Sequence, residues 1–287
     1  MTLWLPIAIG LCMFGKGLES HSGELEGGYN FWFYSPYDSI ATDSTGARSS
    51  HPLIVFLHGA SLCGKNLDRV RTYGTIDAIE KGRKIDSYVV APQNPGGSWS
   101  PRKVMQVVDW AKENFDVDTT RIYVIGMSLG GYGTLDFVAT YPDRIAAAMA
   151  LCGGATVRDL SGLNRVPLWI IHGIADRAVT IRQSDRVVEA MKAADNATPR
   201  LKYDRIPGMN HGQPAKFLYL SDTYDWLLSH SLTDEDRKVN DTFDPANGIL
   251  SKAYYGLTFN KSGRSYRSKK GKSARSKRRK SSAKSKK

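Results

Sequence analysis

The residues Gly126-Met127-Ser128-Leu129-Gly130-Gly131 decide the fold prediction, because they join an apolar run to a helical pattern. The apolar run, residues 121–125, predicts a strand, and residues 129–141 predict a helix that ends at Pro142. A serine at such a sharp turn exposes its hydroxyl at the sheet edge, and the flanking glycines let neighbouring backbone pass closely. We therefore predict that Ser128 is a nucleophile. The alternative is a glycine-rich helix start with a capping serine.

Outward from this turn, short apolar runs alternate with helical patterns. The predicted strands are residues 29–34, 53–57, 87–91, 145–151, 168–171 and 200–206, and the predicted helices are residues 102–114, 180–194 and 215–230. We expect residues 29–34 to form an antiparallel edge strand. The alternation is typical of an α/β fold, a single domain with a mostly parallel sheet and helices on both faces.

A serine nucleophile needs a histidine base and a carboxylate that orients it. His211 lies in a loop with two glycines after the last predicted strand, and Asp176 follows the strand before it. The order Ser128, Asp176, His211 is the one expected when all three follow parallel strands. Asp143 and Asp185 are the weaker alternatives for the carboxylate.

The other five histidines are assigned to structural or surface roles. His58 and His172 directly follow strands and are expected to be buried and hydrogen bonded, whereas His21, His51 and His230 are expected to face solvent.

The turn after residues 53–57 is the expected place for an oxyanion hole. Two backbone N–H donors would stabilise a tetrahedral oxyanion, one from Leu129 and one from Ala60, with Ser61 as the neighbouring choice. Cys63 and Cys152 both follow strands near this edge, where a disulfide and two separate thiols are both possible. Trp99, in a glycine-rich loop after another strand, is a candidate substrate platform, although sealing a helix start is the alternative.

Residues 28–230 resemble the α/β-hydrolases, and more narrowly the esterases related to family one carbohydrate esterases, polyhydroxybutyrate depolymerases and prolyl oligopeptidase catalytic domains. The strings that carry the resemblance are Phe56-Leu57-His58-Gly59-Ala60, Ala91-Pro92-Gln93, the Ser128 turn, Tyr141-Pro142-Asp143 and His172-Gly173-Ile174-Ala175-Asp176. The resemblance implies acyl-serine chemistry on carboxylic esters, with no metal and no cofactor. Residues 61–64 depart from the Gly-Glu continuation that is usual in the oxyanion turn.

The charge is concentrated at one end of the chain. The formal net charge of +12 arises from residues 261–287, which hold 14 basic side chains and no acidic one, while residues 1–260 carry a net charge of −2. With eight serines and one aromatic residue, this segment is expected to be a disordered tail. It is either a solvated appendage or a contact to an anionic surface or polyanion, and no specific nucleic-acid binding is expected.

The N-terminus carries an apolar run of twelve residues, Leu3 to Phe14. That length is too short to span a bilayer and is typical of a secretory signal, although no basic residue precedes it. We expect a signal peptide at residues 1–17, a hydrolase domain at 18–260 and export to the periplasm or medium.

The resemblance to esterases, together with the candidate aromatic platform at Trp99 and the expected export, favours an esterase that removes acetyl or feruloyl groups from polysaccharides. The rival functions are a (lyso)phospholipase, carboxylesterase or peptidase on the same fold, or a polyanion-binding protein that acts through its tail.

Overall fold

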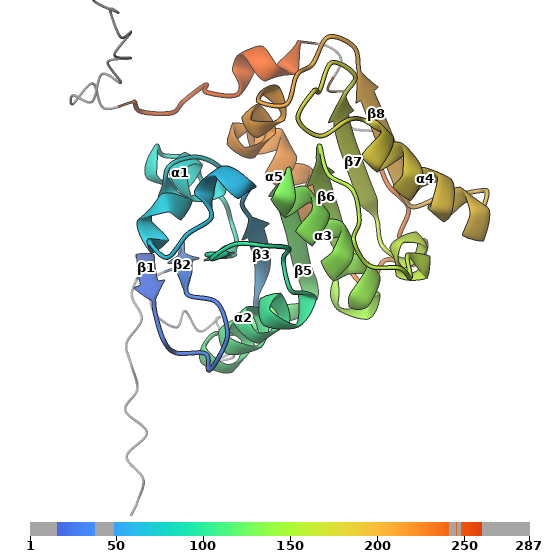
Figure 1. The fold of residues 1–287 in the computed structure, drawn as a ribbon. Helices are drawn as coiled ribbons and strands as arrows, with labels where there is room; N and C mark the ends of the chain where they lie inside the picture. The colour runs from blue at the N-terminus through green and yellow to red at the C-terminus, as the bar shows by residue number, and fades with distance from the viewer. Residues whose placement is uncertain (1–15, 38–48, 241–244, 246–247, 260–287) are drawn as a thin grey trace, which may run out of the picture.

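The computed structural model describes residues 16–37, 49–240, 245 and 248–259. Their centre is an eight-stranded sheet with the order β1-β2-β4-β3-β5-β6-β7-β8 (Figure 1). The strands are β1 (Gly17–His21), β2 (Phe31–Ser35), β3 (His51–Leu57), β4 (Tyr88–Pro92), β5 (Val117–Met127), β6 (Ala147–Leu151), β7 (Leu168–Gly173) and β8 (Leu201–Ile206). Strands β3 to β8 are parallel, and β1 and β2 are antiparallel to their neighbours.

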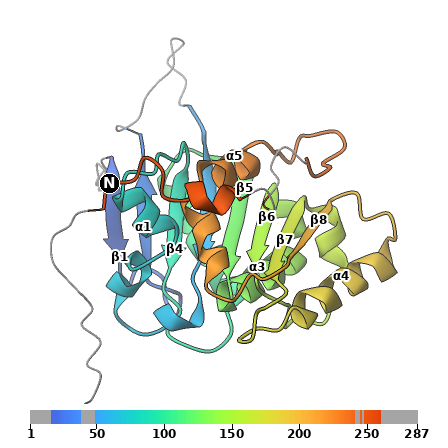
Figure 2. The ribbon, with the colours of Figure 1, turned by 90° about the horizontal axis from the view of Figure 1, so that it is seen from above.

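Helices cover both faces of this sheet, as Figure 2 shows from above. The α-helices are α1 (Thr75–Glu80), α2 (Pro101–Asn114), α3 (Leu129–Thr140), α4 (Arg182–Ala194) and α5 (Ser221–Leu228). Short 3₁₀ turns span Ala60–Leu62, Leu67–Arg71, Pro142–Arg144, Ser161–Arg165, Gln213–Tyr219 and Ile249–Lys252. None of the helices in the described ranges is long and apolar enough to cross a membrane.

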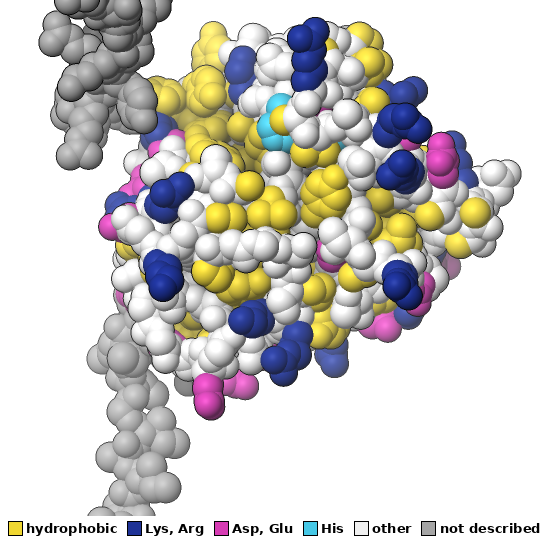
Figure 3. Space-filling model, viewed as in Figure 1, with side chains coloured by type: hydrophobic (Ala, Val, Ile, Leu, Met, Phe, Trp, Pro, Cys, Tyr) yellow, Lys and Arg dark blue, Asp and Glu magenta, His cyan; other side chains and the backbone are white. Residues whose placement is uncertain are grey.

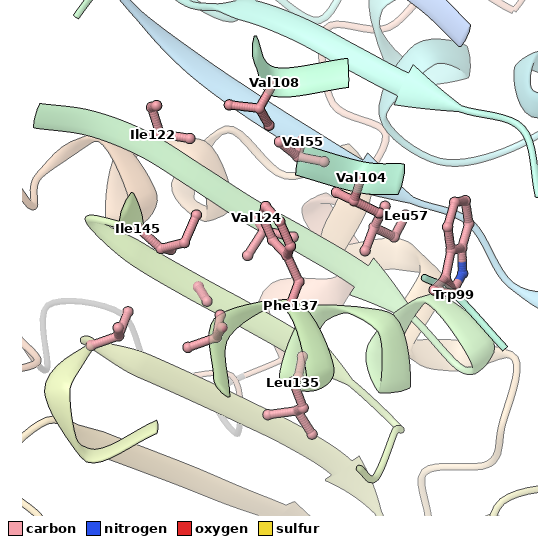
Figure 4. Packing of buried hydrophobic residues seen from close by; sticks show 14 of the residues in the cluster. Val55, Leu57, Trp99, Val104, Val108, Ile122, Val124, Leu135, Phe137 and Ile145 are labelled. Carbon is pink, nitrogen blue, oxygen red and sulfur yellow. The ribbon is translucent and has the colours of Figure 1, made fainter. Parts of the chain in front are cut away.

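The side chains of the central strands alternate between two hydrophobic layers. Val55 and Leu57 of β3 pack with Phe137 of α3 on one face (Figure 4), while Ile54 and Phe56 pack on the opposite face with α1 and α5. Each such side chain contributes about 1.5–3 kcal/mol to folding when it is fully buried. Burial on both faces explains the continuous apolar runs in the sequence and gives the sheet a rigid carboxyl edge.

The predicted mostly parallel sheet with helices on both faces is therefore confirmed. Two details differ from expectation. The strand near residues 29–34 is not at the edge, because β1 pairs with its outer side, Gly17 opposite Ser35. Gly17, expected to be the last residue of a signal peptide, is thus already part of the sheet. The helix expected from residue 215 begins as a 3₁₀ turn, and α5 starts only at Ser221.

The apolar run at residues 3–14 and the basic segment 261–287 both lie outside the described residues.

Candidate active site

Ser128 occupies a strained turn between β5 and α3. Its backbone lies at φ 58° and ψ −119°, a region that L-residues rarely adopt. The neighbouring glycines are required by close packing: a Cβ on Gly126 would lie 2.3 Å from the Gly130 carbonyl oxygen, and one on Gly130 would lie 1.8 Å from that of Leu57. The glycines thus allow α3 to press against β3 while Ser128 stands at the carboxyl edge.

His211 and Asp176 complete a hydrogen-bonded relay with Ser128. The Nε2 atom of His211 lies 3.0 Å from the Ser128 Oγ atom, and its Nδ1 atom lies 2.7 Å from the Asp176 Oδ2 atom. Because the carboxylate can only accept, Nδ1 carries the hydrogen and Nε2 is free to take the serine proton. The structure therefore brings together the three residues that the sequence predicts as the catalytic group.

Asp176 is held as an acceptor by the loop that follows β7. Its Oδ1 atom accepts hydrogen bonds from the backbone N–H groups of Ala178 and Val179, both at 2.9 Å. The side chain of His172 is fully buried beside it, with Nε2 3.4 Å from Oδ2. Burial lowers the pKa of His172, which favours the neutral imidazole there.

The oxyanion turn begins at His58 and is fixed by that side chain. The Nε2 atom of His58 accepts a hydrogen bond from the N–H of Asn94 at 3.0 Å, which directs Nδ1–H to the Gly59 carbonyl oxygen at 2.8 Å. Burial lowers the pKa of His58 to about 4, so the imidazole is neutral at physiological pH. The structural role predicted for His58 is therefore observed.

A pocket of about 290 Å³ opens over the nucleophile. It is lined by Gly59, Ala60, Ser61, Tyr73, Met127, Ser128, His211, Gly212 and Ala215. In the space-filling view a histidine and hydrophobic side chains are visible together on this face (Figure 3). Such a pocket suits a small acyl group carried by an ester.

Of the two candidate oxyanion donors, Ala60 from the 3₁₀ turn after β3 lines this pocket, and Leu129 at the start of α3 directly follows the pocket residue Ser128. As the first residue of α3, Leu129 has no acceptor for its N–H inside the helix. Within the described chain, no acceptor is recorded for the N–H of Ala60 or of Ser61. Ala60 and Ser61 both therefore remain candidates for the second oxyanion donor, and both line the pocket beside Gly59.

Tyr73 is a pocket residue that the sequence reasoning missed. Its hydroxyl oxygen accepts a hydrogen bond from the Gly59 N–H at 3.2 Å and lies 3.4 Å from the Ser61 Oγ atom. Burial raises the pKa of Tyr73, which keeps the hydroxyl protonated. No motif surrounds Tyr73 in the sequence; it reaches the site only because the loop between β3 and α1 folds back over the edge.

Trp99 lies elsewhere than predicted. Its side chain is only 3% exposed, donates from Nε1 to the His58 carbonyl oxygen at 3.3 Å and packs edge-on against Tyr29. A Cβ on Gly133 would lie 2.6 Å from the indole ring, so α3 covers that side. The predicted substrate platform is thus replaced by a packing role beneath the oxyanion turn.

Three further predictions are resolved by the structure. Cys63 and Cys152 are free thiols, and burial raises the pKa of Cys152 to about 12. The expectation that His21 and His230 face solvent is wrong: His21 stacks on Phe31, and His230 packs on Trp226. Stacking on aromatic neighbours, which single-residue reasoning overlooks, accounts for both cases.

A cluster of possible metal ligands coincides with the catalytic group. Donor atoms of Cys152, Asp176 and His211 all lie within 4.8 Å of one another. Both nitrogens of His211 are already engaged by Ser128 and Asp176, and the Cys152 thiol stays protonated. The hydrogen-bonded relay accounts for these residues without a metal ion.

Comparison with known proteins agrees with this geometry. The prolyl oligopeptidase family model matches residues 90–164. A solved structure described as a thermostable esterase superposes with a TM-score of 0.59 at 22% identity, covering 75% of this chain and 63% of that one. The chain has the α/β-hydrolase fold.

Curated proteins similar to this chain include two with named activities. The poly(3-hydroxyalkanoate) depolymerase C of Paucimonas lemoignei is 30% identical over 59% of this chain and 57% of its own length. The bifunctional acetylxylan esterase/xylanase XynS20E of Neocallimastix patriciarum is 28% identical over 58% of this chain and 24% of its own length. The chain therefore spans little more than half of the first relative and a quarter of the second.

Proposed function

We propose that this α/β-hydrolase is a serine esterase that cleaves carboxylic esters through an acyl-serine intermediate. The observation that carries the proposal is the unbroken relay from Ser128 to His211 to Asp176 beside an open pocket. A relay of this geometry makes a serine hydroxyl nucleophilic at neutral pH, because the proton has an acceptor already in place.

In the first half-reaction, the Ser128 Oγ atom attacks the ester carbonyl carbon while the His211 Nε2 atom takes its proton. Asp176 stabilises the imidazolium that forms without being protonated itself. The N–H groups of Ala60 and Leu129 would donate to the oxyanion, and one such donor contributes about 3–4 kcal/mol to the transition state. Collapse of the intermediate releases the alcohol, which receives the proton from His211.

In the second half-reaction, water replaces the alcohol. His211 takes a proton from the water as it attacks the acyl-serine carbonyl, and the same oxyanion site stabilises the second tetrahedral intermediate. Breaking the bond to Oγ returns the proton to Ser128 and releases the carboxylic acid.

For the substrate, we propose acetyl or feruloyl esters of polysaccharides. The pocket volume of about 290 Å³ accommodates a short acyl group, and a named relative is an acetylxylan esterase. A second candidate is a polyester of hydroxyalkanoic acids, favoured by the depolymerase relative at 30% identity. The two substrates share the same ester chemistry, so a panel of acetylated xylan, methyl ferulate, poly(3-hydroxybutyrate) and lysophospholipid separates them.

The catalytic proposal is tested with Ser128→Ala. We expect this variant to lose labelling by a fluorophosphonate probe and hydrolysis of p-nitrophenyl acetate. Ser221→Ala, which removes an exposed hydroxyl at the start of α5, is the matched control and should label as the wild type does. Labelling of Ser128→Ala at the wild-type rate would overturn the proposal.

Export by a signal peptide at the N-terminus is also proposed, from the length of the apolar run at residues 3–14. The mature N-terminus, sequenced after expression with an intact leader, tests this directly.

A further inference from the structure

The loops around the pocket form a basic rim. Strands β3 to β8 are parallel, so the loops that leave their carboxyl ends lie on the same edge as Ser128 and His211. We define the rim by the cations on these loops and the helix starts that follow them: Lys65, Arg69, Arg102, Arg158, Arg177, Arg182, Arg186 and Lys216. Figure 3 shows Lys and Arg side chains distributed over this face, with Asp and Glu mostly toward its margins.

Three members of the rim contact, or directly follow in the chain, a residue of the pocket or the relay. Arg69 donates to the carbonyl oxygen of Ser61, a residue that lines the pocket, at 2.6 Å. Arg177 directly follows Asp176 and is exposed, and Lys216 directly follows the pocket residue Ala215. Positive charge is therefore held at one wall of the pocket by Arg69 and is carried by the chain segments that contain Asp176 and Ala215.

The eight rim cations have no carboxylate partner among the described side chains, whereas Arg71, on the same loop as Lys65 and Arg69, pairs with Asp68 and Glu80. Cations elsewhere are paired as well. Arg165 pairs with Asp143, and Lys81 pairs with Asp77. The carboxylates on the rim's own edge include Asp68, which lies 3.6 Å from Arg71, Asp185, which pairs with Arg205, the buried Asp176, Asp159, and Glu24 and Glu26 on the β1–β2 loop. None of these carboxylates forms an ion pair with a rim cation among the described side chains, and residues 1–260 as a whole carry a net charge of −2.

We propose that the basic rim selects anionic ester substrates, specifically polysaccharides that carry uronic acid carboxylates near the esterified sugar. This inference rests on the proposed esterase function. The pocket itself contributes an apolar site for the acyl group, and the rim attracts the carboxylates of the neighbouring sugars. A cleft surrounded by one sign of charge raises the local concentration of oppositely charged substrate, and salt screens the effect.

The test uses two esters that transfer the same acetyl group, 4-acetoxybenzoate and its neutral methyl ester. Their intrinsic reactivities differ, so the measured quantity is the salt dependence of the ratio of kcat/KM for the charged ester to that for the neutral one. We expect this ratio to fall at least threefold between 10 and 500 mM NaCl, on the order of the steering effects of charged clefts. A ratio that does not change with salt would overturn the inference.

Matched charge variants test whether the salt dependence of the kcat/KM ratio arises from the rim cations. The triple variant Arg158→Gln, Arg182→Gln, Arg186→Gln removes three exposed rim cations. The control triple variant Lys84→Gln, Arg144→Gln, Lys192→Gln removes three exposed cations at the opposite edge and changes the net charge equally.

We expect the rim variant to lose most of the salt dependence and to hydrolyse acetylated glucuronoxylan more slowly, while its turnover of the neutral ester stays within twofold. The control variant should behave as the wild type does. If the two triple variants behave equally, the proposed role of the rim in selecting anionic esters is refuted. If the wild type hydrolyses neither ester, the proposed esterase function is refuted instead.

Discussion

Asp176→Asn changes one atom of the catalytic relay and leaves its shape intact. The Asp176 carboxylate accepts three close hydrogen bonds, from Ala178 N–H, Val179 N–H and His211 Nδ1–H. An asparagine has only one acceptor oxygen. If that oxygen stays with the two backbone donors, the new NH₂ group faces His211 and forces the hydrogen from Nδ1 to Nε2.

In that tautomer His211 presents a hydrogen to Ser128 and cannot accept its proton. We expect kcat for p-nitrophenyl acetate to fall by about 10⁴-fold, the size of the same substitution in the serine protease triad, which corresponds to about 5 kcal/mol in the barrier. KM should change little, because Asp176 does not line the pocket.

Asp136→Asn is the control for loss of a buried carboxylate. Asp136 is also buried and accepts hydrogen bonds from the backbone N–H groups of Thr156 and Val157, but it is not part of the relay. That variant should lower the thermal midpoint while keeping kcat within a few-fold. Retention of more than a tenth of the wild-type kcat by Asp176→Asn, in a folded protein, would refute the tautomer argument.

Four further outcomes follow from the same structure. Ala60→Pro removes the N–H of a candidate oxyanion donor. Gly59 tolerates a proline after it, because its backbone is extended at φ −78° and ψ 169°. We expect kcat to fall about 10²–10³-fold in Ala60→Pro, and we expect the control Ser61→Ala to retain activity. Gly130→Ala places a Cβ against the Leu57 carbonyl oxygen. We therefore expect the free energy of unfolding, measured in urea, to decrease by several kcal/mol, which is more than most point variants cause. Burial lowers the pKa of His58 in the folded protein to about 4, whereas an ordinary histidine has a pKa of about 6.5. Because the folded state favours the neutral form, stability is lost as pH falls from about 6.5 toward 4. The free energy of unfolding should therefore drop by about 2 kcal/mol more between pH 7 and 5 in the wild type than in His58→Gln. Deletion of residues 261–287 should leave turnover of p-nitrophenyl acetate unchanged and weaken retention on an anionic matrix, and a large fall in turnover would contradict the separation of tail and catalysis.

The three residues of the proposed catalytic relay could be brought together from the sequence because each is marked by a local feature. Ser128 is marked by the glycines that the turn requires, and Asp176 and His211 each lie in the loop that follows a recognisable strand. Parallel strands carry their carboxyl ends to one edge, so chain order alone places the three side chains together.

Residues whose position depends on distant packing could not be predicted in the same way. Strand β1 (Gly17–His21) forms because β2 offers it an edge to pair with. Its own short sequence shows no alternation of apolar and polar residues that would predict a strand. For a similar reason, Tyr73 lines the pocket although no motif marks it, and Trp99 is buried although its loop predicted an exposed side chain. The glycine-rich loop suggested an exposed indole at Trp99, but α3 approaches closely at Gly133 and covers it.

The burial of Trp99 and the position of Tyr73 in the pocket change where substrate specificity should be sought. With Trp99 beneath the oxyanion turn, the pocket wall presents the hydroxyl groups of Tyr73 and Ser61, and the charged groups proposed around its mouth are those of the basic rim. Stacking on an aromatic platform would be insensitive to salt, whereas attraction by the rim is screened by it. Since Trp99 is buried, a charged-to-neutral ester ratio that falls with salt would assign specificity to the charged mouth that the folded loops present.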